Sequence, residues 1–106
     1  MFSGCSSLKK LNISNFNTNR VTSMSKMFSK CSCLKELNLS SFNTNKVNDM
    51  SFMFFECLSL TELYLSNFVT NRKTNIESMF KGCFKELQNK ISDQYPDLIK
   101  YNYNCF

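Results

Sequence analysis

A repeat of 26 residues constrains this chain more than any other feature of its sequence. Met-Phe pairs begin at residues 1, 27, 53 and 79 of the 106 residues, and a cysteine follows each pair at the same distance. We call residues 26 apart a column. The other apolar and hydroxyl columns are Leu8, Leu34 and Leu60; Leu11, Leu37 and Leu63; Ile13, Leu39 and Leu65; Phe16, Phe42 and Phe68; and Thr18, Thr44 and Thr70. This periodicity predicts one structural unit used about three times over residues 1–83.

Each copy has two halves with different apolar periods. In the second copy residues 37–40 alternate apolar and polar side chains, which predicts a short strand with one buried face. Further on, apolar residues recur at offsets of three and four, which predicts a short helix that starts after Thr44 or Asn45. These apolar residues are Val47, Met50, Met53, Phe54 and Cys57. In the third copy Lys73 replaces the valine of this column, so we expect the helix to start near Asn75.

Neither half can bury its apolar stripe alone, so successive copies must stack. The predicted fold is a right-handed α/β solenoid, a leucine-rich-repeat-like stack of short parallel strands and short helices. Residues 84–106 do not follow the leucine pattern, and Phe84, Leu87 and Ile91 share one helical face. Because Pro96 favours a new helix start, we expect residues 84–106 to form a C-terminal helical cap on the last repeat.

The motif Met-Phe-x-x-Cys-x-x-Leu-x-x-Leu-x-Leu-Ser-x-Phe-x-Thr-Asn-x-Val-x-x-Met-Ser, read from Met27 to Ser51, resembles the BspA-like leucine-rich repeat. The resemblance covers about residues 1–83. It implies a non-catalytic solenoid used for adhesion or binding, often in a longer array on a cell surface or secreted. No signal peptide or anchor is recognisable in these residues, so the location is left open.

Composition narrows the chemistry. The chain has no histidine, and its six cysteines include no Cys-x-x-Cys pair, so we expect no metal site, no cofactor and no enzyme activity. No apolar run is long enough to span a membrane. The cysteine column is expected to hold inert buried thiols, whereas Cys33 and Cys105 are the candidates for bridging or modification.

The outward side of the strands is the first candidate binding surface, because solenoids commonly bind through such a face. Its predicted residues are Lys10, Asn12, Ser14, Glu36, Asn38, Ser40, Glu62, Tyr64 and Ser66. Tyr64 is the one aromatic anchor among them. The partner would be a protein or a glycan, and the alternative is a solvated face that binds nothing.

A basic stripe formed by Arg20, Lys46, Arg72 and Lys73 is a second candidate, for anions or acidic polysaccharides. We do not expect nucleic-acid binding, because the formal charge of +5 is small and no aromatic platform accompanies these charges. A third interpretation is a truncated remnant of a longer array without activity. Because Met1 falls in mid-repeat, further repeats or a partner are expected to cover the N-terminal face.

Overall fold

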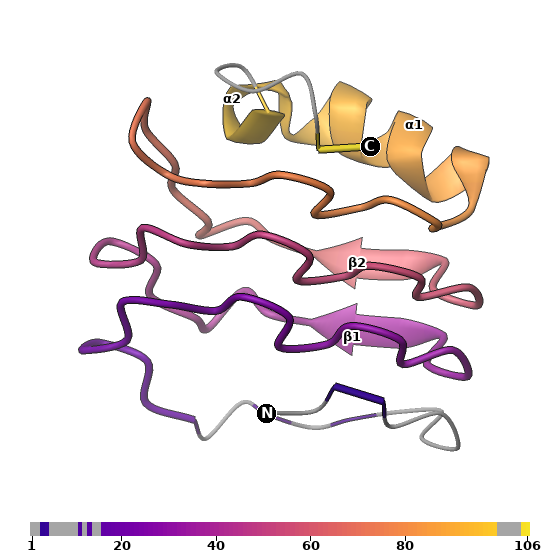
Figure 1. The fold of residues 1–106 in the computed structure, drawn as a ribbon, viewed down its shortest axis with the longest axis horizontal. Coiled ribbons are helices and arrows are strands. Elements are labelled where there is room, and N and C mark those ends of the chain that lie inside the picture. The colour runs from indigo at the N-terminus through magenta and orange to yellow at the C-terminus, as the bar shows by residue number, and fades with distance from the viewer. Residues whose placement is uncertain (1–2, 5–10, 12, 14–15, 100–104) are drawn as a thin grey trace.

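The computed structural model describes residues 3–4, 11, 13, 16–99 and 105–106. Two strands and two helices follow one another along these residues: β1 (Glu36–Asn38), β2 (Glu62–Tyr64), α1 (Lys85–Gln94) and α2 (Pro96–Ile99). The strands pair in parallel with Glu36 opposite Glu62, Leu37 opposite Leu63 and Asn38 opposite Tyr64. Each pair is 26 residues apart, so the register of this sheet equals the period of the sequence (Figure 1).

The alternating side chains of the strands explain which face is buried. Leu37 is fully buried and Leu63 is 5% exposed, while their neighbours on both sides are exposed. Leu11, from the same column, packs against the core as a half-buried residue. The two strands therefore present one apolar face inward and one polar face outward, as the alternation predicts.

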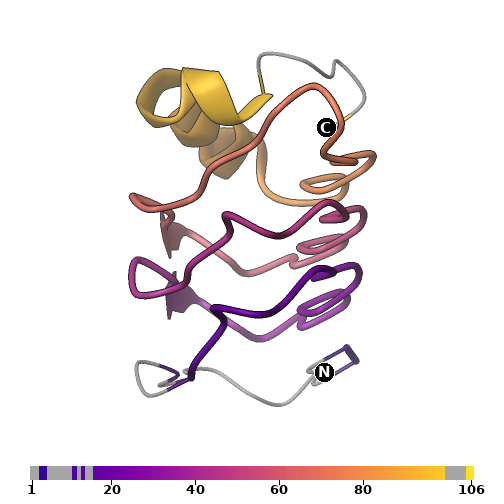
Figure 2. The ribbon, with the colours of Figure 1, turned by 90° about the vertical axis from the view of Figure 1, so that its left-hand side faces the viewer.

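Three turn segments, residues 21–31, 47–57 and 73–83, lie opposite the strands and stack on one another (Figure 2). Every second amide of one segment donates to a carbonyl of the next. Met24 donates to Asp49 at 2.8 Å and Phe28 to Met53 at 2.9 Å, and the same bonds recur one period later from Met50 and Phe54. These bonds satisfy backbone groups that would otherwise be buried without partners.

The short helices expected in these segments are absent, and this prediction is wrong for residues 16–83. Bonds from residue i+3 to residue i, such as Met53 to Met50 and Cys57 to Phe54, form successive tight turns instead. A positive φ at five residues breaks any helix: Lys26, Lys30, Phe52, Glu56 and Ser78. The apolar spacing of three fits these turns as well as it fits a helix, and the remaining amides bond between segments rather than within one.

Glycine occupies this turn position at the two ends of one column. Gly4 and Gly82 have φ values of 77° and 85°, and Lys30 and Glu56 stand between them in the same column with φ near 60°. A Cβ at Gly82 would lie 2.9 Å from the Glu56 Cγ atom and 3.1 Å from its Cα. The glycine therefore allows both the backbone conformation and the close approach of the second turn segment.

Aromatic stacking continues through the core along one column. The rings of Phe28 and Phe54 are 5.8 Å apart and tilted by 2°, and those of Phe54 and Phe80 are 5.4 Å apart and tilted by 10°. All three side chains are fully buried. By contrast, the predicted turn-corner column is fully buried only at Phe42, because Phe16 is 38% exposed and Phe68 is half-buried.

Helices α1 and α2 lie beyond the last turn segment, next to β2 (Figure 1). Leu87, Ile91 and Leu98 are buried, and the Leu65 amide donates to the Tyr95 hydroxyl oxygen at 3.1 Å. Pro96 begins α2 as the sequence predicts. Phe84, however, immediately precedes α1 and is 51% exposed, so its expected place on the buried face is wrong.

The last two residues return to the columns. Cys105 lies 26 residues after Met79 and Phe106 lies 26 after Phe80, although sequence analysis had found no counterpart for Cys105. The Phe80 amide donates to the Cys105 carbonyl at 2.7 Å, as Phe54 does to Met79, and the Phe106 ring lies 5.8 Å from the Phe80 ring. Residues 79–104 therefore span one period that contains helices in place of a strand.

Candidate binding surface

The described part of the strand face consists of the outward side chains of the two strands and of the residues that follow them. These are Glu36, Asn38, Ser40, Glu62, Tyr64 and Ser66. Four of them lie within the paired strands, and Ser40 alone is half-buried rather than exposed. Lys10, Asn12 and Ser14, which were predicted to extend this face, lie outside the described residues.

Local hydrogen bonds fix the end of β1. The Asn38 Oδ1 atom accepts from the Ser40 amide at 3.0 Å and from the Ser40 hydroxyl at 2.6 Å. This Asx-type turn holds both side chains in one arrangement. Asn67 reaches across from the next copy and donates its Nδ2 group to the Ser40 carbonyl. The strand face is therefore preorganised at this end, which lowers the entropy that a ligand would have to overcome.

Tyr64 is the large exposed side chain of the strand face, with 42% of its surface accessible. Its hydroxyl donates to the Glu62 Oε2 atom at 3.4 Å. The negative charge of Glu62 raises the pKa of Tyr64, so the phenol stays protonated and remains a hydrogen-bond donor. An exposed aromatic ring with a polar tip is the kind of side chain that often anchors an interface.

Helix α1 borders this face next to β2. The Lys90 Nζ atom lies 3.7 Å from the Glu62 Oε1 atom and donates to the Thr61 carbonyl at 3.3 Å. Both side chains of this ion pair are about half exposed, so we assign it little stability. Its effect is positional: Glu62 is held between Lys90 and Tyr64, and the acidic side of the strand face is partly neutralised.

The residues of the predicted basic stripe are all exposed: Arg20, Lys46, Arg72 and Lys73. Asn43, close in sequence to Lys46, donates its Nδ2 group to the Asn19 Oδ1 atom at 3.2 Å, so the turns that carry Arg20 and Lys46 are joined between copies. The structure thus supplies two separate polar surfaces, one on the strands and one on the turns that follow the threonine column.

The threonine column has a role that sequence analysis missed. Thr44 is 1% exposed; its hydroxyl oxygen accepts from the Val69 amide at 2.8 Å and its hydroxyl donates to the Val69 carbonyl at 3.3 Å. Thr18 makes the same pair of bonds with Asn43. The third member, Thr70, donates instead to the Leu98 carbonyl of α2 at 3.0 Å. Thr44 therefore joins adjacent copies rather than beginning a helix, and its repetition was the available signal.

The described cysteines have no disulfide and are Cys31, Cys33, Cys57, Cys83 and Cys105. The Cys57 thiol donates to the Phe28 carbonyl and the Cys83 thiol to the Phe54 carbonyl, each at 3.1 Å. Burial raises the pKa of Cys83 to about 12, and burial together with Cys83 and Cys31 raises the pKa of Cys57 further. Such thiols are poor nucleophiles, because the thiolate is the reactive form.

Of the two cysteines proposed for bridging, only Cys33 is partly accessible. Cys105 is 1% exposed, and burial raises its pKa. Its assignment as an accessible thiol is therefore wrong, since it occupies the buried column of Met79. Among the residues that the structure describes, no group of three or more cysteine or acidic side chains could hold a metal ion.

We expect alkylation with iodoacetamide to modify Cys33 much faster than Cys57, Cys83 or Cys105 in the folded protein. The three buried thiols should stay slow between about pH 7 and about pH 9, because so little thiolate forms below a raised pKa. Peptide mapping by mass spectrometry resolves each position, and the urea-unfolded protein is the control. Rapid labelling of Cys57 in the folded protein would contradict this burial.

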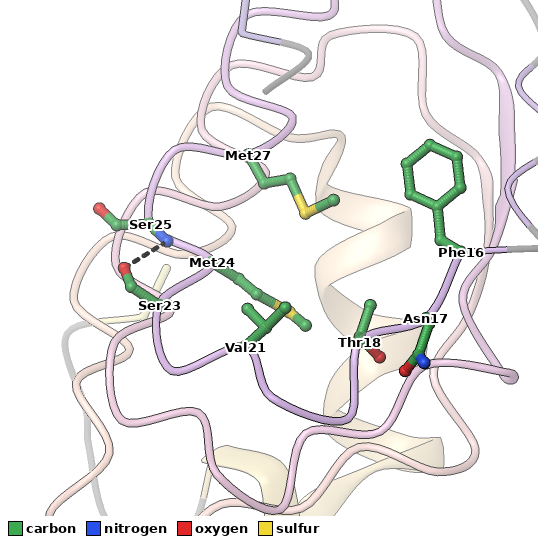
Figure 3. A pocket seen from close by; sticks show the side chains of 8 residues that line it. All are labelled: Phe16, Asn17, Thr18, Val21, Ser23, Met24, Ser25 and Met27. Atoms are coloured by element: carbon green, nitrogen blue, oxygen red, sulfur yellow. Dashed lines mark hydrogen bonds between the residues drawn. The ribbon is translucent and has the colours of Figure 1, made fainter.

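A cavity of about 260 Å³ lies on the inner side of the first turn segment (Figure 3). Its lining is Phe16, Asn17, Thr18, Val21, Ser23, Met24, Ser25 and Met27. Val21 and Met24 point into it, and they belong to the columns of Val47 and Met50, which are buried in the next segment. The cavity is thus the apolar interior continued, and because no ionisable side chain lines it, it has no group for acid–base catalysis.

Among the described residues no helix is long and apolar enough to cross a bilayer. The sequence repeats, the strand register and the bonds between copies together define a chain of the repeat-protein class. The family model described as "Mycoplasma protein of unknown function, DUF285" matches residues 1–95, so the chain belongs to this family, which is associated with BspA-like repeat proteins. Comparisons with curated proteins and with solved structures gave no match.

Proposed function

We propose that this chain is a right-handed, leucine-rich-repeat-like solenoid that acts as a non-enzymatic binding or adhesion module. The solenoid interpretation is supported by strands and turn segments that pair at 26-residue spacing. Helices α1 and α2 would close the last copy. The resemblance to BspA-like proteins favours a role at a cell surface or outside the cell, with a protein or glycan as the ligand.

The observation that carries this proposal is the strand face itself. Two adjacent strands hold exposed polar side chains in register, and Tyr64 stands among them with its hydroxyl held by Glu62. Such a face offers fixed hydrogen-bond donors and acceptors around one aromatic anchor. Catalysis is disfavoured because the chain has no histidine and burial raises the pKa of the column thiols.

We expect Tyr64→Ala and Asn38→Ala each to weaken binding about tenfold or more, since truncating an anchor or its preorganised neighbour removes contacts at the centre of the face. The assay is surface plasmon resonance against the strongest ligand from a panel of immobilised glycans and extracellular-matrix proteins.

Leu58→Ala is the matched control, because Leu58 is 52% exposed and lies outside the strand face. Its affinity should equal that of the unmodified protein. If both strand-face variants retain full affinity for that ligand, the binding site lies elsewhere and the proposal fails.

A further inference from the structure

A second surface departs from the repeat in a way that the stacking does not require. Phe52 shares its column with Lys26 and Ser78, and Phe55 shares its column with Ser3, Ser29 and Lys81. The turn segments therefore accept small or charged residues at these positions. Two aromatic side chains in the middle segment alone are a local exception, and such exceptions concentrate at functional sites.

The two rings form a partly exposed pair. Their centroids are 5.3 Å apart with an interplanar angle of 71°, and both side chains are half-buried. Phe52 also has a φ of 57°, a conformation that bulky residues rarely adopt. This backbone directs an apolar side chain outward at a position where most residues of the column are hydrophilic.

Lysines lie beside the aromatic pair. A groove of about 390 Å³ is lined by Ser3, Lys26, Ser29, Lys30, Phe52 and Phe55. Lys26 and Lys30 are exposed and have nearly identical φ values of 60° and 61°, and their amides are fixed to the Ser51 and Phe55 carbonyls. No acidic side chain lines the groove. The nearest acidic residue in sequence, Glu56, lies against Gly82 of the third segment instead.

We propose that this groove binds an acidic oligosaccharide, in which sulfate or carboxylate groups meet Lys26 and Lys30 and the apolar face of a sugar ring rests on Phe52 and Phe55. Charge complementarity selects an anionic ligand. The positive edge of sugar C–H groups complements the negative face of an aromatic ring. Ser3 and Ser29 add hydroxyl groups that can bond to sugar hydroxyls.

An extended acidic peptide fits this groove less well. Strand addition requires free main-chain groups on the receptor. Here the amides of Lys26 and Lys30 and the carbonyls of Ser51 and Phe55 already bond to one another between segments. Recognition must therefore come from side chains, and rings, hydroxyls and cations are the side chains present. This site is distinct from the strand face and from the basic stripe.

The test uses a size-defined heparin oligosaccharide as the probe and isothermal titration calorimetry at fixed salt concentration. The variants take their residues from the same columns, which protects the fold. Lys26→Ser with Lys30→Gly removes the two charges, and Phe52→Ser with Phe55→Ser removes the rings without changing the net charge. Each pair is expected to lower the affinity about tenfold or more.

Arg20→Ser with Lys46→Ser is the matched control, because it removes the same charge from the basic stripe. We expect this pair to change the affinity less than about threefold, the effect of net charge alone. A loss in this control as large as that in the lysine pair would overturn the proposal. Full affinity of the phenylalanine pair, or equally tight binding of poly-glutamate to the unmodified protein and the phenylalanine pair, would also overturn it. Circular dichroism confirms that each variant is folded.

Discussion

Phe54→Ala is expected to destabilise the protein by about 3–5 kcal/mol, the usual cost of truncating a fully buried phenylalanine. Phe54 stacks on Phe28 on one side and on Phe80 on the other, so the truncation opens the middle of the aromatic column. Because small proteins have only about 5–15 kcal/mol of stability in total, a large part of the folded population is at risk. Urea unfolding followed by circular dichroism measures the change.

Phe55→Ala is the control for this experiment, since Phe55 is adjacent in sequence but half-buried on the outer side of the same turn segment. We expect it to cost less than about 1.5 kcal/mol, because little of its surface leaves a packed interior. Equal losses in Phe54→Ala and Phe55→Ala would contradict the buried aromatic column.

Thr44→Val should cost about 1–3 kcal/mol although the two side chains have the same shape, because it leaves buried backbone groups without a partner. Thr44 is the bonding partner of both the Val69 amide and the Val69 carbonyl. The substitution should also raise the hydrogen-exchange rate of the Val69 amide, which NMR measures directly.

Thr44→Ser keeps the hydroxyl and provides the comparison for Thr44→Val. It should retain most of the protection of the Val69 amide and lose only the stability due to one methyl group, about 1 kcal/mol. If Thr44→Val leaves the Val69 amide as protected as in the unmodified protein, then the threonine is not the bond that joins these copies.

Sequence alone predicted the strands and their burial. Alternation around Leu37 and Leu63 predicted both strands, and the 26-residue period agrees with the register in which they pair. It also predicted that Glu36, Asn38 and Tyr64 point outward. These features could be predicted because a strand has a side-chain period of two, which few other structures share.

The turn segments could not be predicted in the same way. An apolar residue at every third or fourth position is compatible with a helix and also with a series of tight turns. What separates the two is where the backbone amides bond, and this depends on the neighbouring copy. Lysine, phenylalanine and glutamate at positive φ gave no warning, because Gly4 and Gly82 are the only glycines in the chain.

The groove beside Phe52 and Phe55 was missed for a different reason. Sequence analysis searched for residues that recur, and these two phenylalanines are informative because they do not recur. Their pairing with Lys26 and Lys30 depends on the stacking of one turn segment on another, which brings together residues about one period apart. The return of Cys105 and Phe106 to their columns could have been found by extending the count of 26 beyond Cys83.

Because the helical stretch of residues 79–104 spans one period, it can be exchanged for an ordinary copy without shifting the phase of what comes next. Phe106 meets Phe80 in the same way that Phe80 meets Phe54, whichever type of unit lies between. Gene duplication or recombination in steps of one whole unit would therefore leave the interior aligned. A deletion of a single codon, in contrast, would move each downstream side chain out of line with its counterparts.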